Sequence, residues 1–136
     1  MLGTLHDLYA LIRKDHRKMI ALLAQIISLS DRAQAVAALE EFKTLLRDHE
    51  RVEDEALYPA LTLDAWPSDI AVAHASIRSA LCDLEHTASD AAEWWQGVVH
   101  LRHNVERHIV EEETALGTAP SIATAPPDDD PVSSRL

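Results

Sequence analysis

Two histidine–glutamate pairs in this sequence have residue types and a spacing that suit metal chemistry. His49 is followed by Glu53 and His108 by Glu112, so each glutamate comes four residues after its histidine. In an α-helix, that spacing places both side chains on one face, one turn apart. Imidazole nitrogen and carboxylate oxygen at this distance can bind the same cation. The two pairs therefore point to a metal site.

The pairs need support from elsewhere in the chain, because eight histidines are present and a pair at this spacing can be a plain surface interaction. Two further histidines, His16 and His74, provide it. They precede His49 and His108 by 33 and 34 residues, which makes an internal repeat. The segments after the motif histidines also match, since they read HERVEDEAL and HIVEEETAL. All four histidines lie on apolar stripes.

A buried carboxylate is costly unless a cation neutralises it. Few cationic side chains lie on the inward stripes, and Arg78 is the exception. It could hold a glutamate or a bound anion, or its stem could pack while its head group reaches water. A bound metal ion is the simplest partner for the acidic and imidazole groups together. The predicted metal ligands are His16, His49, Glu53, His74, His108 and Glu112.

The ligand types favour iron or manganese over structural zinc, because imidazole and carboxylate are present and no thiolate is. Two ions, each with two histidines and both sharing two bridging glutamates, would use all six side chains. An oxo or hydroxo bridge would add a fifth ligand and leave one position open on each ion, where a small molecule reacts. We find no nucleophile or acid–base pair for hydrolysis, so we expect no catalytic residue beyond the metal ligands and no organic cofactor.

The elements that must position these residues are helices, since apolar residues recur at spacings of three and four. Polar and proline-containing breaks divide the chain into helices at about 4–29, 31–62, 69–87 and 90–116. Short connections favour antiparallel neighbours, which predicts an all-α, up-down-up-down four-helix bundle. We expect this domain to cover residues 1–117. The segment 118–136, rich in proline and aspartate, reads as a disordered tail.

The composition limits the function classes. The formal net charge of -11 argues against nucleic acid or an anionic membrane as a partner. A single cysteine, Cys82, excludes an intramolecular disulfide, and no signal peptide or membrane-spanning run is visible. We expect a cytoplasmic protein, monomeric in the simplest case, whose partner is a small molecule.

The motifs taken together resemble the hemerythrin-like HHE cation-binding family. The segments that carry the likeness are KDH, HERVEDEALYPAL, AHASIRSAL and HIVEEE, and the likeness covers about residues 5–116. The resemblance implies a four-helix bundle with a non-haem di-iron centre. In it the histidines would be terminal ligands and the two glutamates would bridge the irons.

Two departures separate this chain from the oxygen-carrying hemerythrins. The carriers have a second histidine four residues after the helix-three ligand, and here that residue is Arg78. Glu50 and Tyr58 are the candidates to replace the missing ligand, although helical phase puts them about 100° and 180° from the His49 direction. The last motif is His-x3-Glu, whereas the carriers use His-x4-Asp. Both departures argue against a dedicated oxygen carrier.

The resemblance implies a di-iron protein that reacts with hydrogen peroxide, nitric oxide or oxygen, with catalase-like or peroxidase-like oxidoreductase activity or protection against oxidative and nitrosative stress. The alternative is a module that reversibly binds oxygen, or senses oxygen or iron, without turnover. A third interpretation is iron holding or a purely structural role.

Overall fold

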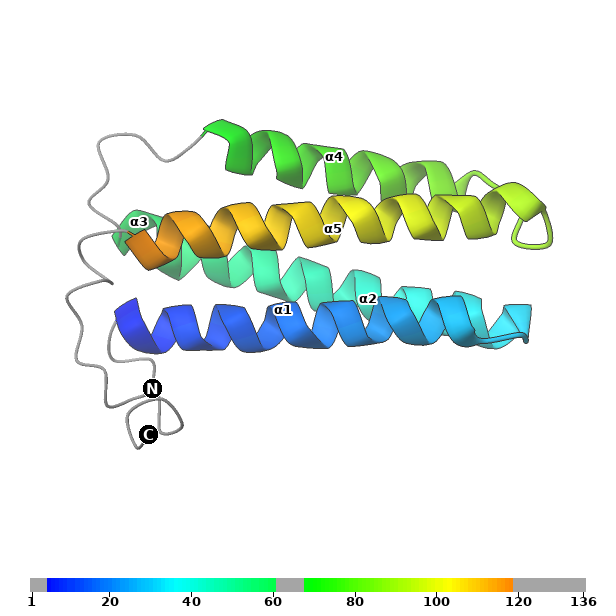
Figure 1. Cartoon of the computed structure of the whole chain (residues 1–136), viewed down its shortest axis with the longest axis horizontal. Helices are drawn as coiled ribbons and strands as arrows, with labels where there is room; N and C mark the ends of the chain where they lie inside the picture. The colour runs from blue at the N-terminus through cyan, green and yellow to red at the C-terminus, as the bar shows by residue number, and fades with distance from the viewer. Residues whose placement is uncertain (1–4, 61–67, 119–136) are drawn as a thin grey trace.

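Four antiparallel rods form the protein, in a computed structural model that describes residues 5–60 and 68–118 (Figure 1). The first rod is α1 (Leu5–Ser28). The second is continuous and consists of α2 (Arg32–Val52), the π-helical turn η1 (Glu53–Leu57) and α3 (Tyr58–Ala60). The third and fourth rods are α4 (Ser68–Glu85) and α5 (Ala92–Thr118). The described residues contain no strand, so the all-α four-helix fold is confirmed.

Short polar turns make neighbouring rods antiparallel. Asp31 caps α2, because its Oδ1 accepts hydrogen bonds from the backbone N–H groups of Ala33 (2.9 Å) and Gln34 (3.2 Å). Arg32 then connects this turn to the start of α5. Its guanidinium lies 4.7 Å from the ring centroid of Trp95 and donates to the carbonyl of Ala91 at 3.3 Å. The two turns therefore fix one end of the bundle.

The apolar core has two parts with a polar layer between them. The larger cluster lies toward the α1–α2 turn and includes Met19, Phe42, Ile77 and Val105. The smaller cluster lies toward the opposite end of the bundle and consists of Leu8, Ile12, Leu57 and Leu116. Along the helices, the motif histidines and glutamates fall between these clusters. The core therefore closes the polar layer from both ends.

The structure describes none of the predicted tail beyond Thr118, so that prediction lies outside the described residues. Within 5–60 and 68–118, no helix has the length and apolarity to cross a membrane.

Candidate metal centre

The six residues predicted from the sequence come together in the polar layer. All are buried, with exposed fractions of 0–7%. Each rod contributes: α1 supplies His16, α4 supplies His74, and the other two rods supply one histidine–glutamate pair each. One ligand atom each from His16, Glu53, His108 and Glu112 lies within 4.8 Å of the others. The structure thus has a buried His/Glu cluster to which all four rods contribute.

Glu53 faces two histidines with its two oxygens. Its Oε2 lies 3.0 Å from Nε2 of His49, and its Oε1 lies 3.4 Å from Nε2 of His74. The carboxylate therefore lies between the second rod and α4, with one oxygen near His49 and the other near His74.

Glu112 has the same arrangement. Its Oε1 lies 3.0 Å from Nε2 of His16 and 4.0 Å from Nε2 of His49. Its Oε2 lies 3.6 Å from Nε2 of His108 and 3.9 Å from Nε2 of His74. Two half-sites result, one around His16 and His49 and the other around His74 and His108. Each half-site receives one oxygen from each glutamate.

These short distances do not correspond to hydrogen bonds. Among the described residues, no hydrogen-bond partner satisfies Nε2 of His16, Nε2 of His49, either oxygen of Glu53 or Oε1 of Glu112. Buried polar atoms without partners are costly. Here they converge on common points instead of on one another, as ligands around a cation do. The donor set and its geometry therefore fit a metal.

A comparison with protein families supports the interpretation as a metal site. The family model described as Hemerythrin HHE cation binding domain matches residues 7–119, which is most of the chain. This chain belongs to that family. The searches of curated proteins and of solved structures found no match to it. The predicted resemblance is confirmed, and the hemerythrin domain identifies the buried cluster as a metal-binding module.

The electrostatics of this hemerythrin domain place protons where a cation would bind. Burial lowers the pKa of His49, but the Glu53 carboxylate, 3.0 Å away, outweighs it and raises the pKa to about 9. Burial raises the pKa of Glu112 to about 7, with help from the charge of Glu53. Burial and the neighbouring His74 lower the pKa of His108 to about 3. A metal ion entering the site must displace the bound protons.

The hemerythrin domain also orients two of its histidines from outside the cluster. Nδ1 of His16 donates to Oε2 of Glu113 at 2.8 Å, and Nδ1 of His49 donates to Oδ2 of Asp15 at 3.3 Å. Such carboxylates fix the ring orientation and leave Nε2 free for a metal. The sequence analysis missed both. Asp15 directly precedes His16 and Glu113 directly follows Glu112 in the sequence. This adjacency to predicted ligands is the signal that could have indicated them.

Tyr58 lies closer to the site than its helical phase predicted. The predicted angle of about 180° assumed an unbroken α-helix. The turn from Glu53 to Leu57 is π-helical, and the N–H of Tyr58 donates to the carbonyl of Glu53. A π-turn accommodates one extra residue, so Tyr58 takes the place of an i+4 residue, on the face of Glu53. Pro59 follows directly; it lacks an N–H and would clash with an α-helical i−4 carbonyl.

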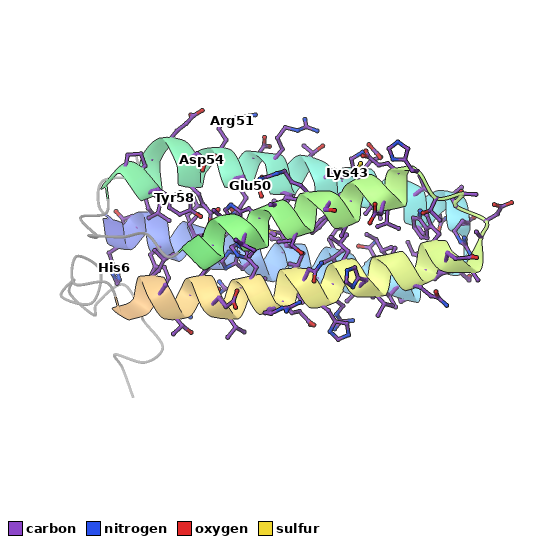
Figure 2. The ribbon with its side chains drawn as sticks, turned by 90° about the horizontal axis from the view of Figure 1, so that it is seen from above. His6, Lys43, Glu50, Arg51, Asp54 and Tyr58 are labelled. Carbon is purple, nitrogen blue, oxygen red and sulfur yellow. The ribbon has the colours of Figure 1, made fainter. Side chains whose placement is uncertain are left out.

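Arg78 has its head group at the surface, which is one of the alternatives that the sequence left open for it. Its side chain is 58% exposed, and its Nη1 lies 3.5 Å from Oε1 of Glu50. Glu50 is half-buried between α2 and α4, and burial raises the pKa of its carboxyl. Figure 2 shows Glu50 on the side of α2 that faces α4. Arg78 therefore occupies the place of the carriers' histidine without entering the site.

The remaining histidines lie outside the cluster. His100 and His103 are on the exposed side of α5, and His86 follows the end of α4, where its Nδ1 donates to the carbonyl of Cys82 at 2.8 Å. Trp94 is a buried core residue with Trp95 beside it, as expected for packing.

Proposed function

We propose that the cluster binds two iron ions and that Glu53 and Glu112 bridge them. The observation that supports this proposal most is that the two oxygens of each glutamate face different half-sites. One ion would take His16 and His49 with one oxygen of each glutamate, and the other would take His74 and His108 with the remaining oxygens. A single ion could not use oxygens that face opposite ways.

The donor set supports iron over other cations. Four imidazoles and two carboxylates without a thiolate suit a divalent or trivalent transition metal and disfavour a structural zinc site. Calcium and magnesium prefer sites made of oxygen ligands alone. Four protein ligands for each ion leave coordination positions for small molecules, which makes the site a centre of reaction and not a closed structural one.

The proposed activity is disproportionation of hydrogen peroxide, in which two peroxide molecules give one dioxygen and two water molecules. Two bound irons would supply the two-electron couple that this reaction needs, since one peroxide is oxidised to dioxygen while the other is reduced to water. The chain's own residues hold the pair and exclude bulk water, since apolar clusters close the layer at both ends.

Tyr58 has a role in proton movement in this proposal. Its hydroxyl donates to Oε2 of Glu112 at 2.7 Å, and its ring stacks on His74 with centroids 6.3 Å apart. Burial and the negative charge of Glu112 and Glu53 raise its pKa far above the usual value. The phenol therefore keeps its proton beside the His74–His108 half-site in the metal-free protein. Two bound cations would lower its pKa again, so that it could donate this proton to an oxygen of the reactant.

The direct test is oxygen evolution from hydrogen peroxide by iron-loaded protein. We expect turnover in the wild-type chain, loss of at least about tenfold in His108→Ala, and no loss in His103→Ala, which changes an exposed histidine of the same helix. Absence of turnover in the wild-type protein, or equal rates in the two variants, would reject the proposed activity.

A further inference from the structure

The His16–His49 half-site has an outer layer of carboxylates. Nδ1 of His16 lies 2.8 Å from Oε2 of Glu113, and Nδ1 of His49 lies 3.3 Å from Oδ2 of Asp15. A carboxylate that accepts the outer N–H of a histidine fixes its ring and makes the inner nitrogen a stronger ligand. Both inner nitrogens are buried and have no hydrogen-bond partner among the described residues, so a cation has no hydrogen bond within the protein to displace. This half-site is therefore preorganised for a metal ion.

The His74–His108 half-site lacks such an outer layer within residues 5–60 and 68–118. Nδ1 of His108 is buried without a hydrogen-bond partner there, so a metal on Nε2 would leave a buried N–H group without an acceptor. The Nε2 atoms of His74 and His108 lie 3.1 Å apart and share a hydrogen bond. An ion must break this hydrogen bond before it can bind both nitrogens. Metal binding at this half-site therefore has costs that the other half-site does not have.

Glu50 does not supply the missing outer layer. Its carboxylate is near enough to His74 to interact with it electrostatically, but no hydrogen bond joins the two side chains. One oxygen, Oε2, has no hydrogen-bond partner in the part of the chain that the structure describes, and the other, Oε1, lies 3.5 Å from Nη1 of Arg78. One oxygen therefore faces an exposed arginine, and neither accepts from the ring of His74.

The two oxygens of Glu112 add to the difference. Oε2, which faces His74 and His108, accepts a hydrogen bond from the hydroxyl of Tyr58 at 2.7 Å. Oε1 faces the other half-site and accepts no hydrogen bond from any described residue. A hydrogen bond stabilises the charge of a carboxylate oxygen and makes that oxygen a weaker donor to a cation. Glu112 therefore offers its stronger oxygen to the half-site that already has the outer carboxylates.

We propose that Asp15 and Glu113 make the His16–His49 position the one that binds its metal ion first and keeps it. The His74–His108 position binds more weakly and exchanges its ion with solution. Since one outer carboxylate changes metal affinity by about 10–100-fold, two should separate the positions by about 100-fold or more. The identity of the ions as iron rests on the proposed function, whereas the order of binding does not. A chain short of iron would hold one ion, and the two-electron reaction would require the second.

Anaerobic titration of the metal-free protein with ferrous iron, in competition with a chromogenic chelator, tests this order. The wild-type chain should bind two ions in two steps whose dissociation constants differ by about 100-fold or more. His16→Ala should abolish the tight step. His74→Ala should keep the tight step and lose the weak one, because it removes a ligand from the other position.

Glu113→Gln tests the outer carboxylate without removing any of the six predicted ligands. The tight step should weaken by about 10–100-fold, and the weak step should stay unchanged. Glu111→Gln changes an exposed residue of the same helix and should leave both steps unchanged. Far-UV circular dichroism and thermal midpoints of the metal-free variants check that each keeps the helical fold.

The possible outcomes separate the order of binding from the two-iron proposal. A tight step that survives in His16→Ala and disappears in His74→Ala would overturn the order, as would equal affinities in Glu113→Gln and Glu111→Gln. Two ions bound in a single step would also overturn it, and would leave the two-iron proposal standing. One ion per chain in total, lost in His16→Ala and kept in His74→Ala, would support the order and reject the two-iron centre.

Discussion

The hydroxyl of Tyr58 donates a 2.7 Å hydrogen bond to Oε2 of Glu112, the oxygen that faces His74 and His108. The π-turn makes this contact possible, because it moves Tyr58 onto the face of Glu53. A phenol and a carboxylate from different rods are thereby joined at the edge of the proposed di-iron centre. Figure 2 shows Tyr58 at the end of the bundle where η1 leads into α3.

Tyr58→Phe should preserve iron content and slow peroxide turnover by about 100-fold, the usual range for loss of one positioned proton donor. The ring and its stacking on His74 remain, so the change removes only the hydroxyl. Oxygen evolution and the visible spectrum of the ferric protein are the measurements. Loss of an intense visible band in the variant would show instead that Tyr58 is a phenolate ligand, which would contradict the proton-donor role.

Asp15→Asn should weaken metal binding at the His16–His49 half-site by about 10–100-fold, because the carboxylate that orients His49 becomes a neutral amide. Competition with a chelator, followed by elemental analysis, measures the loss. The control is Asp48→Asn, whose side chain is 58% exposed and pairs only with Arg51 across one helical turn at 3.5 Å among the described residues. Equal metal retention in the two variants would show that Asp15 does not orient a ligand.

Glu53→Gln should lower the iron content to about one ion or less per chain, because an amide neither neutralises nor bridges two cations as a carboxylate does. Glu55→Gln changes an exposed residue of the same turn and should leave the content unchanged. Full iron content in Glu53→Gln would show that Glu53 does not bridge the two ions.

The metal-free protein should lose stability as pH rises from 7 to 9. His49 has a folded pKa of about 9, above its ordinary 6.5, so its protonated form stabilises the fold below that range and the stabilisation disappears as the proton leaves. The pKa of His74 is also raised, and it acts in the same direction. Two pKa units or more correspond to a loss on the order of 2–3 kcal/mol.

Chemical denaturation at a series of pH values measures this loss in the free energy of unfolding. The iron-loaded protein should show a much flatter profile over the same range, because metal replaces the proton. A metal-free His49→Gln variant should also lose most of the slope. The same slope in loaded and metal-free samples would mean that metal does not occupy the proton's place.

Periodicity predicted the bundle and the buried cluster because both follow from which residues share a helical face. Ile12, His16 and Leu23 recur at helical spacing, and all three are buried. The position of Tyr58 could not be predicted, since a single π-turn changes the phase of every residue after it. The spacing placed Arg78 on the inward stripe but could not decide between a carboxylate partner and water, because a long side chain can reach water from the edge of the stripe.

The carboxylates that orient the histidines escaped prediction for a different reason. Asp15 and Glu113 lie beside the apolar stripes, where charged residues normally face solvent. Only the packing of α1 against α2 and α5 shows that Asp15 meets His49 and Glu113 meets His16. Sequence spacing describes one helix at a time, and these contacts join different helices.

Mössbauer spectroscopy of protein loaded with ⁵⁷Fe, with elemental analysis of the same sample, measures whether two irons share Glu53 and Glu112. We expect two irons per chain that form one magnetically coupled pair in the ferric state. One iron per chain, or two irons without magnetic coupling, would contradict it.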